Sequence, residues 1–383
     1  MKNILLFFFL FCQSILFAQE KIYFPDRHHW EEKDPAFFGI DEKQLNIAID
    51  SIKSNEYSGP VDLEQAILKG FEREPFHQIL GPTKRRGGPA GMILKNGYCI
   101  AKWGDTKRVD MTFSVTKSYL STIAGLAIDH GLITSVEDKV AAYVWDHHFQ
   151  GSHNAKINWE HLLNQSSAWS GQLWGGYDWN DRPPREGDIY KWSKAALPEP
   201  GTEMEYNDVR VNLLAFSLLQ VWRKPLPQVL KEHIMDPINA STTWRWYGYE
   251  NSWTNVDGVQ MQSVSGGGHS GGGIFISTED HGRFGLLCMN AGKWQQKQLI
   301  SEQWLKQATS PSKPNPSYGY MWWLNKNGNE NNRMNNLSKN GFYAAGFGGN
   351  YIIVEPEENL VIVLRWCEPS KANKMLGMIK ESL

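Results

Sequence analysis

The sequence lacks an excess of either charge, because 39 lysines and arginines stand against 41 aspartates and glutamates. It also has no block of basic residues. Surfaces that bind nucleic acids or anionic membranes need dense positive charge, so we expect neither as the main partner. Hydrophobic residues make up 41% of the chain and charged residues 21%, which indicates a globular protein rather than a disordered or membrane-embedded one.

Cysteine is scarce, with four residues in 383. Three of them lie far apart and form no CxxC pair: Cys99, Cys288 and Cys367. A protein of this size does not need disulfides even when it is exported. We therefore expect these three side chains to be buried as small hydrophobic groups.

No metal-binding motif is present. The sequence has no HExxH, and the histidine pairs at 28–29 and 147–148 are adjacent, so their side chains point in different directions on a helix or strand. We expect no metal site and no other cofactor.

The chain has no apolar run of about 20 residues, the length that a membrane-spanning helix needs. Its N-terminus has Lys2, an apolar stretch from Ile4 to Cys12, and Ala18 before the polar Gln19. This pattern is typical of a secretory signal peptide. We predict that residues 1–18 are removed on export and that the protein is periplasmic or secreted, with no membrane span left. A buried N-terminal helix is the alternative.

Strand patterns occur near both ends of the chain. Asn96-Gly97 between two apolar runs predicts a β-hairpin over residues 91–103, and residues 351–366 predict another. Helical periodicity dominates between them, as at residues 115–130 and 209–222. The 17 Trp, 17 Phe and 14 Tyr residues can fill a large core and also line a cleft.

This order predicts an α+β fold. An antiparallel sheet would form from both chain ends, with terminal helices at residues 41–54 and 372–383 flanking it. We predict a discontinuous sheet domain, residues 19–112 plus 301–383, and a mostly helical inserted domain, residues 113–300. Active sites favour such junctions.

Two serine motifs compete for a catalytic role. Gly268-His269-Ser270-Gly271-Gly272 matches GxSxG, which in α/β-hydrolases needs a buried strand before it and an acid and a histidine well after it. The preceding residues 258–266 are too polar for a central strand, and only His281 follows. We interpret this motif as a glycine-rich loop, with α/β-hydrolase chemistry at Ser270 as an alternative.

The second motif is Ser114-Val115-Thr116-Lys117, an SxxK at the start of a predicted helix. Residues i and i+3 share a helix face, and N–H groups at a helix start can help to hold an oxyanion. A lysine serves as a base only if its pKa falls well below about 10.4. A second SxxK, residues 310–313, lies among prolines and cannot form the helical turn.

Three segments together resemble the serine β-lactamase and penicillin-binding-protein superfamily. Residues 112–119, around Ser114 and Lys117, look like its nucleophile helix. Tyr206-Asn207-Asp208, preceded by Pro-Gly-Thr, is similar to its Tyr-x-Asn motif. Ala344-Ala345-Gly346 takes the place of its third motif, often Lys-Thr-Gly. The matches follow the family order over roughly residues 90 to 365.

Further segments resemble the class C-like branch of this superfamily. The loop residues 162–174 and 178–183 and the run Ala344 to Gly349 are similar to 6-aminohexanoate-dimer hydrolases and family VIII-type esterases. The resemblance implies a β-lactamase/transpeptidase-like fold and a serine hydrolase activity.

The resemblance also implies roles for individual residues. Ser114 would be the nucleophile that forms an acyl-enzyme, and Lys117 would accept or relay its proton. Tyr206 would pass the proton to the leaving group and activate water, which a phenol can do beside a cation. The backbone N–H groups of Ser114 and Phe347 would form the oxyanion hole, with Gly346 and its neighbour Ala345 beside the substrate.

Two residues depart from the family pattern. Asp208 replaces asparagine, and a carboxylate next to Lys117 would keep the ammonium charged and shift the role of base towards Tyr206. The alternative is that Asp208 turns outward and caps the next helix. Ala344 replaces the lysine that grips a substrate carboxylate, which argues against a dedicated β-lactamase or D-Ala-D-Ala peptidase.

The aromatic residues Trp169, Trp174 and Tyr177 could line an apolar substrate cleft, and ordinary packing is the alternative for each. With Asp208, Ala345 and Gly346 they complete the candidate substrate-binding residues.

Our hypothesis is an exported serine hydrolase of small-molecule esters or amides. Its rival is a non-turnover ligand-binding or sensor protein of the same fold that keeps a stable acyl adduct. The sequence leaves the natural substrate and the oligomeric state open.

Overall fold

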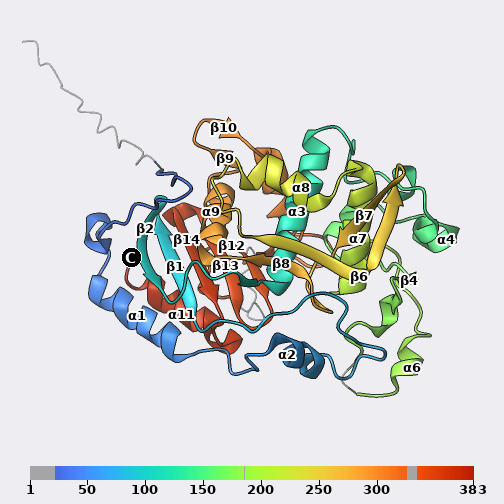
Figure 1. Ribbon diagram of the computed structural model, residues 1–383, viewed down its shortest axis with the longest axis horizontal. Helices are drawn as coiled ribbons and strands as arrows, with labels where there is room; N and C mark the ends of the chain where they lie inside the picture. The colour runs from blue at the N-terminus through green and yellow to red at the C-terminus, as the bar shows by residue number, and fades with distance from the viewer. Residues whose placement is uncertain (1–21, 185, 326–333) are drawn as a thin grey trace, which may run out of the picture.

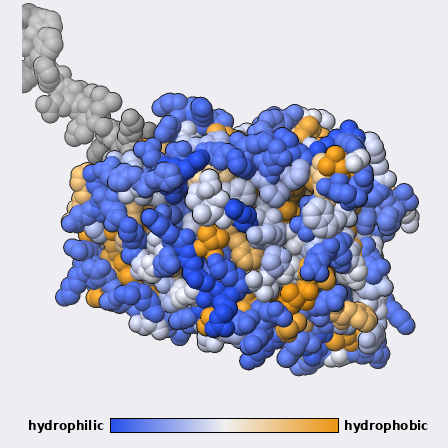
Figure 2. Space-filling view, viewed as in Figure 1, coloured by the Kyte–Doolittle hydropathy of each residue, from blue (hydrophilic) through white to orange (hydrophobic). Residues whose placement is uncertain are grey.

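The structure is a computed structural model that describes residues 22–184, 186–325 and 334–383. The predicted signal segment, residues 1–18, lies outside the described residues. Within these ranges no helix is both long and apolar enough to cross a bilayer. On the face in Figure 2, hydrophobic residues form small areas separated by hydrophilic ones.

The larger sheet has six antiparallel strands in the order β11-β12-β13-β14-β1-β2 (Figure 1). Their bounds are β1 Ala90–Lys95, β2 Tyr98–Trp103, β11 Trp323–Leu324, β12 Phe342–Gly346, β13 Asn350–Glu355 and β14 Leu360–Arg365. Because β1 pairs with β14, with Ile93 opposite Ile362, the two ends of the chain meet inside one sheet. Both predicted hairpins and the predicted α+β architecture are confirmed.

Helices cover both faces of this sheet. The helices α1 Glu42–Ser54 and α11 Ala372–Lys380 lie on one face, and α9 Thr278–Met289 lies on the other (Figure 1). Successive strand residues face opposite sides, so Ile93 packs in the core under α1 and α11 while Met92 packs in the core under α9. This is why the central strands are continuous apolar runs rather than alternating ones.

The middle of the chain is a group of helices around α3 Thr116–Asp129, which is buried from Thr116 to Ala127. The other helices are α2 Leu63–Gly70, α4 Gly151–Asn154, α5 Trp159–Leu163, α6 Ile189–Trp192, α7 Asp208–Trp222, α8 Leu226–Leu230 and α10 Glu302–Ala308. The helical stretches predicted at residues 115–130 and 209–222 correspond to α3 and α7.

A second sheet in the same region has four strands in the order β3-β8-β6-β7. Their bounds are β3 Asp110–Met111, β6 Arg245–Val256, β7 Val259–Val264 and β8 Gly273–Ile276. The sequence analysis did not predict β6, because most of its side chains are polar or aromatic and several are exposed. Two short pairs complete the strands: β4 Gln172–Leu173 with β5 Gly176–Tyr177, and β9 Lys293–Trp294 with β10 Lys297–Gln298.

The three cysteines of the described residues, Cys99, Cys288 and Cys367, are free and buried, as predicted. Burial raises the pKa of Cys99 and of Cys367 to about 12. These thiols therefore stay protonated and act as packing groups.

Candidate active site

Ser114 lies in the short 3-10 turn Phe113–Val115 that leads into α3. It is the one residue between positions 111 and 120 that is not fully buried. Phe113 has a φ of 50°, a left-handed value that bulky residues rarely adopt. The second sheet supports this turn, since the Thr112 N–H donates to the Ile274 carbonyl at 2.9 Å. The strained turn thus presents the Ser114 hydroxyl at the surface of an otherwise buried segment.

Lys117 lies one helical turn after Ser114, and its ammonium group joins two partners. Lys117 Nζ is 2.8 Å from Ser114 Oγ and 2.5 Å from Asp208 Oδ1. Its side chain is buried, so it is not a solvated helix lysine. The SxxK spacing predicted that the serine and the lysine share a helix face, and the structure brings them into hydrogen-bond contact.

Asp208 is the first residue of α7 and points inward at Lys117. The helix cap is the preceding residue, Asn207, whose side chain accepts from the Arg210 N–H at 3.0 Å. The alternative that Asp208 is an outward cap is therefore wrong. The carboxylate is buried beside the ammonium group.

The two buried charges fix one another's protonation state. Burial alone would lower the pKa of Lys117, but the Asp208 carboxylate outweighs it and the pKa is raised above its usual value. Burial alone would raise the pKa of Asp208, but Lys117 and Arg182 hold it well below the usual value. Lys117 is thus an ammonium group at neutral pH, which can donate a hydrogen bond to Ser114 but cannot accept its proton.

Tyr206 lies beside two cations. The centre of its ring is 4.8 Å from Lys117 Nζ and 5.0 Å from the guanidinium carbon of Arg182, and the ring of Trp323 stacks on it at 6.0 Å. Within the described residues, its hydroxyl makes no hydrogen bond to Ser114 or Lys117. The predicted phenol is therefore next to the serine–lysine pair but not linked to it in this state.

A network of ionised side chains extends this pair, and the sequence analysis did not predict it. Arg182 lies 2.5 Å from both Asp181 Oδ1 and Asp208 Oδ2 through its two terminal nitrogens. His269 lies 2.6 Å from Glu74 Oε2 through Nε2 and 3.4 Å from Asp208 Oδ2 through Nδ1. Asp208 begins α7, whereas Glu74, the Asp181–Arg182 pair and His269 come from three loops. His269 belongs to the segment that we interpreted as a glycine-rich loop.

His269 is protonated in this network. Burial alone would lower the pKa of His269, but Asp181, Asp208 and Glu74 together raise it to about 9. With Lys117 and Arg182, the network then has three cations and three carboxylates. Such a buried cluster is tolerated because each charge has partners of the opposite sign.

Two sets of side chains in or next to this network have atoms close enough to hold a metal ion. They are Glu74, His77 and His269, and Asp181, Asp208 and His269, with ligand atoms within 4.8 Å of one another. Both ring nitrogens of His269 already contact carboxylates, and Arg182 pairs with Asp181 and Asp208. The donor set therefore fits an ion network better than a metal site.

The raised pKa of His269 predicts a pH-dependent stability. Because its pKa is higher in the folded chain, the stabilisation is complete below pH about 6.5 and is lost as pH rises through 9. We expect the free energy of unfolding to fall by about 3 kcal/mol over this interval. Urea unfolding at several pH values should show this fall in the wild type and in a control variant at an exposed histidine, His147→Gln, but not in His269→Gln. An equal fall in His269→Gln would contradict the assignment.

The end of β12 lies against the serine turn. A β-carbon built on Gly346 would be 2.2 Å from the Thr112 carbonyl oxygen and 3.3 Å from the Ser114 nitrogen, so only glycine permits this approach. The ring of Phe347 packs on that of Phe113 at 5.1 Å. The backbone segments that carry the two predicted oxyanion donors, Ser114 and Phe347, are thus neighbours.

The neighbours of Gly346 on β12 face the two cores. Ala344 is buried in the core that contains α3 and α9, and Ala345 packs against the core under α1 and α11. Strand alternation turns the Ala345 side chain away from the face that Gly346 presents to Ser114. Only the backbone of Ala345 lies beside the site.

The three candidate cleft aromatics occupy different environments. Trp169 is 1% exposed and donates its indole N–H to the His148 carbonyl, so it packs in the core rather than lining a cleft. Trp174 is half-buried and lines a small cavity together with Asp208 and His269. Tyr177 is 36% exposed and stacks on Trp179.

The second serine motif lacks the surroundings of a nucleophile elbow. The strand before it, β7, is an edge strand, and the Ser270 carbonyl accepts from the Leu80 N–H at 2.9 Å. His281 instead bonds to Thr112 and Tyr119. In the part of the chain that the structure describes, no histidine hydrogen-bonds to the Ser270 hydroxyl.

Comparison with known proteins agrees with this arrangement. The family model described as Beta-lactamase matches residues 100–366, which contain Ser114, Lys117, Tyr206 and the end of β12. The chain belongs to the beta-lactamase family. The resemblance stated from its motifs is confirmed.

Two relatives of this beta-lactamase-family protein are proposed D-alanyl-D-alanine carboxypeptidases of Escherichia coli. The O157:H7 protein is 24% identical over 43% of this chain and 45% of its own length. The strain K12 protein is 23% identical over 71% of this chain and 76% of its own length. The first match thus spans less than half of that relative.

Three solved structures share the fold of this beta-lactamase-family protein. A beta-lactamase from Mycobacterium bovis has a TM-score of 0.54 at 17% identity, covering 84% of this chain and 100% of that one. A proposed 6-aminohexanoate-dimer hydrolase from Bacillus anthracis has 0.51 at 14%, covering 94% and 96%. EstCE1, a hydrolase with promiscuous acyltransferase activity, has 0.56 at 13%, covering 89% and 98%.

Proposed function

We propose that the protein is a serine hydrolase that cleaves carboxylic esters or amides through an acyl-enzyme at Ser114. The observation that carries the proposal is the contact of Lys117 Nζ with Ser114 Oγ at 2.8 Å, on a strained turn beside Gly346. Membership of the beta-lactamase family and the hydrolase names of its structural neighbours support it.

The charge state of the site suggests how the serine proton moves. Lys117 is already an ammonium group, so its part is to stabilise the negative charge that develops on Ser114 Oγ. Tyr206, whose ring lies beside Lys117 and Arg182, relays the Ser114 proton while Oγ bonds to the substrate carbonyl carbon. This proton transfer requires the Tyr206 hydroxyl to turn towards Ser114 when substrate binds.

The remaining steps regenerate the enzyme. Tyr206 gives the proton to the leaving oxygen or nitrogen as its bond to the carbonyl carbon breaks, which leaves the acyl group on Ser114. Water then gives a proton to Tyr206 as its oxygen attacks the acyl carbon, and that proton returns to Ser114 Oγ as the acid departs. The N–H groups of Ser114 and Phe347 hold the carbonyl oxygen in both halves, and loss of one such donor typically costs roughly 100- to 1,000-fold in rate.

Two features favour substrates without a carboxylate next to the reacting group. Ala344 stands where penicillin-recognising relatives have a lysine, and it is buried. Arg182 does not replace that lysine, because both of its terminal nitrogens already pair with Asp181 and Asp208. D-alanyl-D-alanine peptides are the second candidate substrate, suggested by the names of the two relatives.

The signal-like residues 1–18 support export to the periplasm or the medium.

Intact-mass spectrometry during reaction with p-nitrophenyl butyrate separates an enzyme from an acylated receptor. We expect a butyryl adduct that forms and disappears as p-nitrophenol is released over many turnovers. A single equivalent of p-nitrophenol with a persistent adduct would instead support the non-turnover sensor. The same assay with nitrocefin and a D-alanyl-D-alanine peptide tests the two penicillin-recognising activities, for which we expect much slower turnover.

A further inference from the structure

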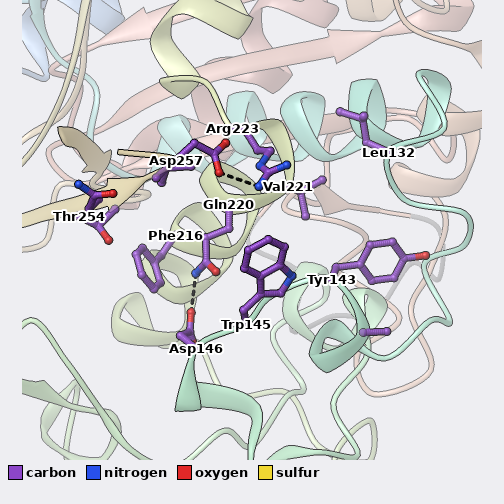
Figure 3. Close-up of a pocket in the computed structure, with 13 residues that line it drawn as sticks. Leu132, Tyr143, Trp145, Asp146, Phe216, Gln220, Val221, Arg223, Thr254 and Asp257 are labelled. Carbon is purple, nitrogen blue, oxygen red and sulfur yellow. Dashed lines mark hydrogen bonds and ion pairs between the residues drawn. The ribbon is translucent and has the colours of Figure 1, made fainter. Parts of the chain in front are cut away.

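A second cavity lies at the far end of α7 from the serine site. It has a volume of about 480 Å³ and is bounded by the last turns of α7, the loop at residues 142–146 and the tip of the β6–β7 hairpin (Figure 3). This volume is within the range of small-molecule sites. Asp208 and Arg223 are 15 positions apart along α7 and its cap, about 22 Å at 1.5 Å per residue. A ligand in this cavity would not touch the groups around Ser114.

An exposed tryptophan dominates this cavity, which we call the Trp145 cavity. Trp145 is 82% exposed, more than any other large hydrophobic side chain of the described residues. In Figure 3 its indole lies in the cavity with the rings of Phe216 and Tyr143 on either side. The Arg223 guanidinium lies 5.3 Å from the indole centre. So large a ring is seldom left in water by packing needs alone, which points to a ligand that stacks on it.

The polar groups of the cavity are paired with one another or with a neighbouring histidine. Asp146 lies 2.6 Å from His148 Nδ1 and accepts from the Gln220 amide at 2.5 Å. Arg223 pairs with Asp257 at 2.6 Å (dashed lines in Figure 3 mark the Gln220 and Asp257 contacts). Burial would raise the pKa of Asp146, but hydrogen bonds from His148 and Gln220 hold it below its usual value. Hydrogen-bond donors and acceptors therefore lie beside the aromatic rings of the cavity.

These features together define a ligand class. A purely apolar ligand would cover the carboxylate, amide and guanidinium groups without replacing their hydrogen bonds to water. An anionic ligand is disfavoured because Asp146 and Asp257 outnumber Arg223. A neutral sugar ring satisfies both requirements, since its C–H face stacks on an indole and its hydroxyls both donate and accept.

We propose that the Trp145 cavity binds a neutral oligosaccharide, with one sugar ring stacked on Trp145 and its hydroxyls bonded to Asp146, Gln220 and the Arg223–Asp257 pair. The site is separate from the serine site and does not depend on the proposed hydrolase activity. It would hold the protein on a glycan surface while the reactive cleft stays open.

Isothermal titration of the full chain with chitotriose, cellotriose and maltotriose tests this proposal. We expect at least one of them to bind with a dissociation constant below about 1 mM, and Trp145→Ala to weaken that binding at least tenfold. The matched control is Trp253→Ala, a 57% exposed tryptophan on β6 outside the cavity, which should leave the affinity unchanged.

Two control measurements show whether Trp145→Ala affects only sugar binding. Turnover of p-nitrophenyl butyrate should be the same in the wild type and Trp145→Ala, and thermal melting should show that this variant folds. The proposal is overturned if none of the three sugars binds at 10 mM, or if Trp145→Ala binds as tightly as the wild type. Preferential binding of an apolar dye in place of sugar would also overturn it.

Discussion

Replacing Ser114 with alanine should lower kcat/KM for p-nitrophenyl butyrate at least about 1,000-fold, because removal of a catalytic nucleophile leaves only binding and oxyanion stabilisation. The variant should fold, since Ser114 is only partly buried and Lys117, the buried partner of its hydroxyl, keeps its contact with Asp208. Steady-state kinetics on purified protein, with thermal melting as the check on folding, gives the result.

Ser270→Ala is the control for this substitution. Its backbone, not its hydroxyl, makes the hydrogen bonds that hold the loop, so we expect activity within about threefold of the wild type. If Ser270→Ala lost activity and Ser114→Ala kept it, the chemistry would belong to the GxSxG segment and the assignment of Ser114 would be wrong.

Replacing Asp208 with alanine should lower the free energy of unfolding by about 3–5 kcal/mol. The carboxylate is buried and contacts both Lys117 and Arg182, at 2.5 Å each. Its removal leaves Lys117 buried without a carboxylate partner, and the cost is that of an unpaired internal charge. Urea unfolding at pH 7 measures it.

Asp257→Ala provides the matched comparison for Asp208→Ala. Asp257 also pairs with an arginine, Arg223 at 2.6 Å, but both side chains are about half exposed. Exposed pairs contribute at most about 1 kcal/mol, so we expect a small loss of stability. Equal losses in the two variants would mean that the buried network does not hold Lys117 as described.

Much of the fold could be predicted from local sequence signals. Asn96-Gly97 between apolar runs defines the β1–β2 hairpin, and the run of residues 360–364 is apolar enough for a strand buried on both faces. The strand β6 could not be predicted, because its pairing with β7 and β8 supplies an order that its polar and aromatic side chains do not signal. Tertiary context overrides propensity there.

The site could be predicted only where residues are close in sequence or match a motif. The i, i+3 spacing is enough to bring Ser114 and Lys117 together. The inward turn of Asp208 could not be decided, since the same residue type also caps helices. Glu74 and His269 are 195 positions apart and both lie in loops without periodicity, so no sequence pattern predicted their contact. Trp169 likewise has no local signal that separates a core ring from a cleft ring.

The buried ion network explains why the lysine alone does not complete a catalytic base. Asp208 keeps Lys117 charged, and Arg182 and His269 in turn balance Asp208. The substitution Asp208→Asn restores the family's usual amide and removes the negative charge that raises the pKa of Lys117. The central element of the site is therefore the serine hydroxyl, which a cation stabilises and no amine deprotonates.

Peptide mapping after labelling with a fluorophosphonate tests that element most directly, because the reagent marks activated serines in proportion to their nucleophilicity. We predict one label per chain on the peptide that contains Ser114, and none in Ser114→Ala. A label on Ser270, or an unlabelled protein that still turns over p-nitrophenyl butyrate, would contradict the account.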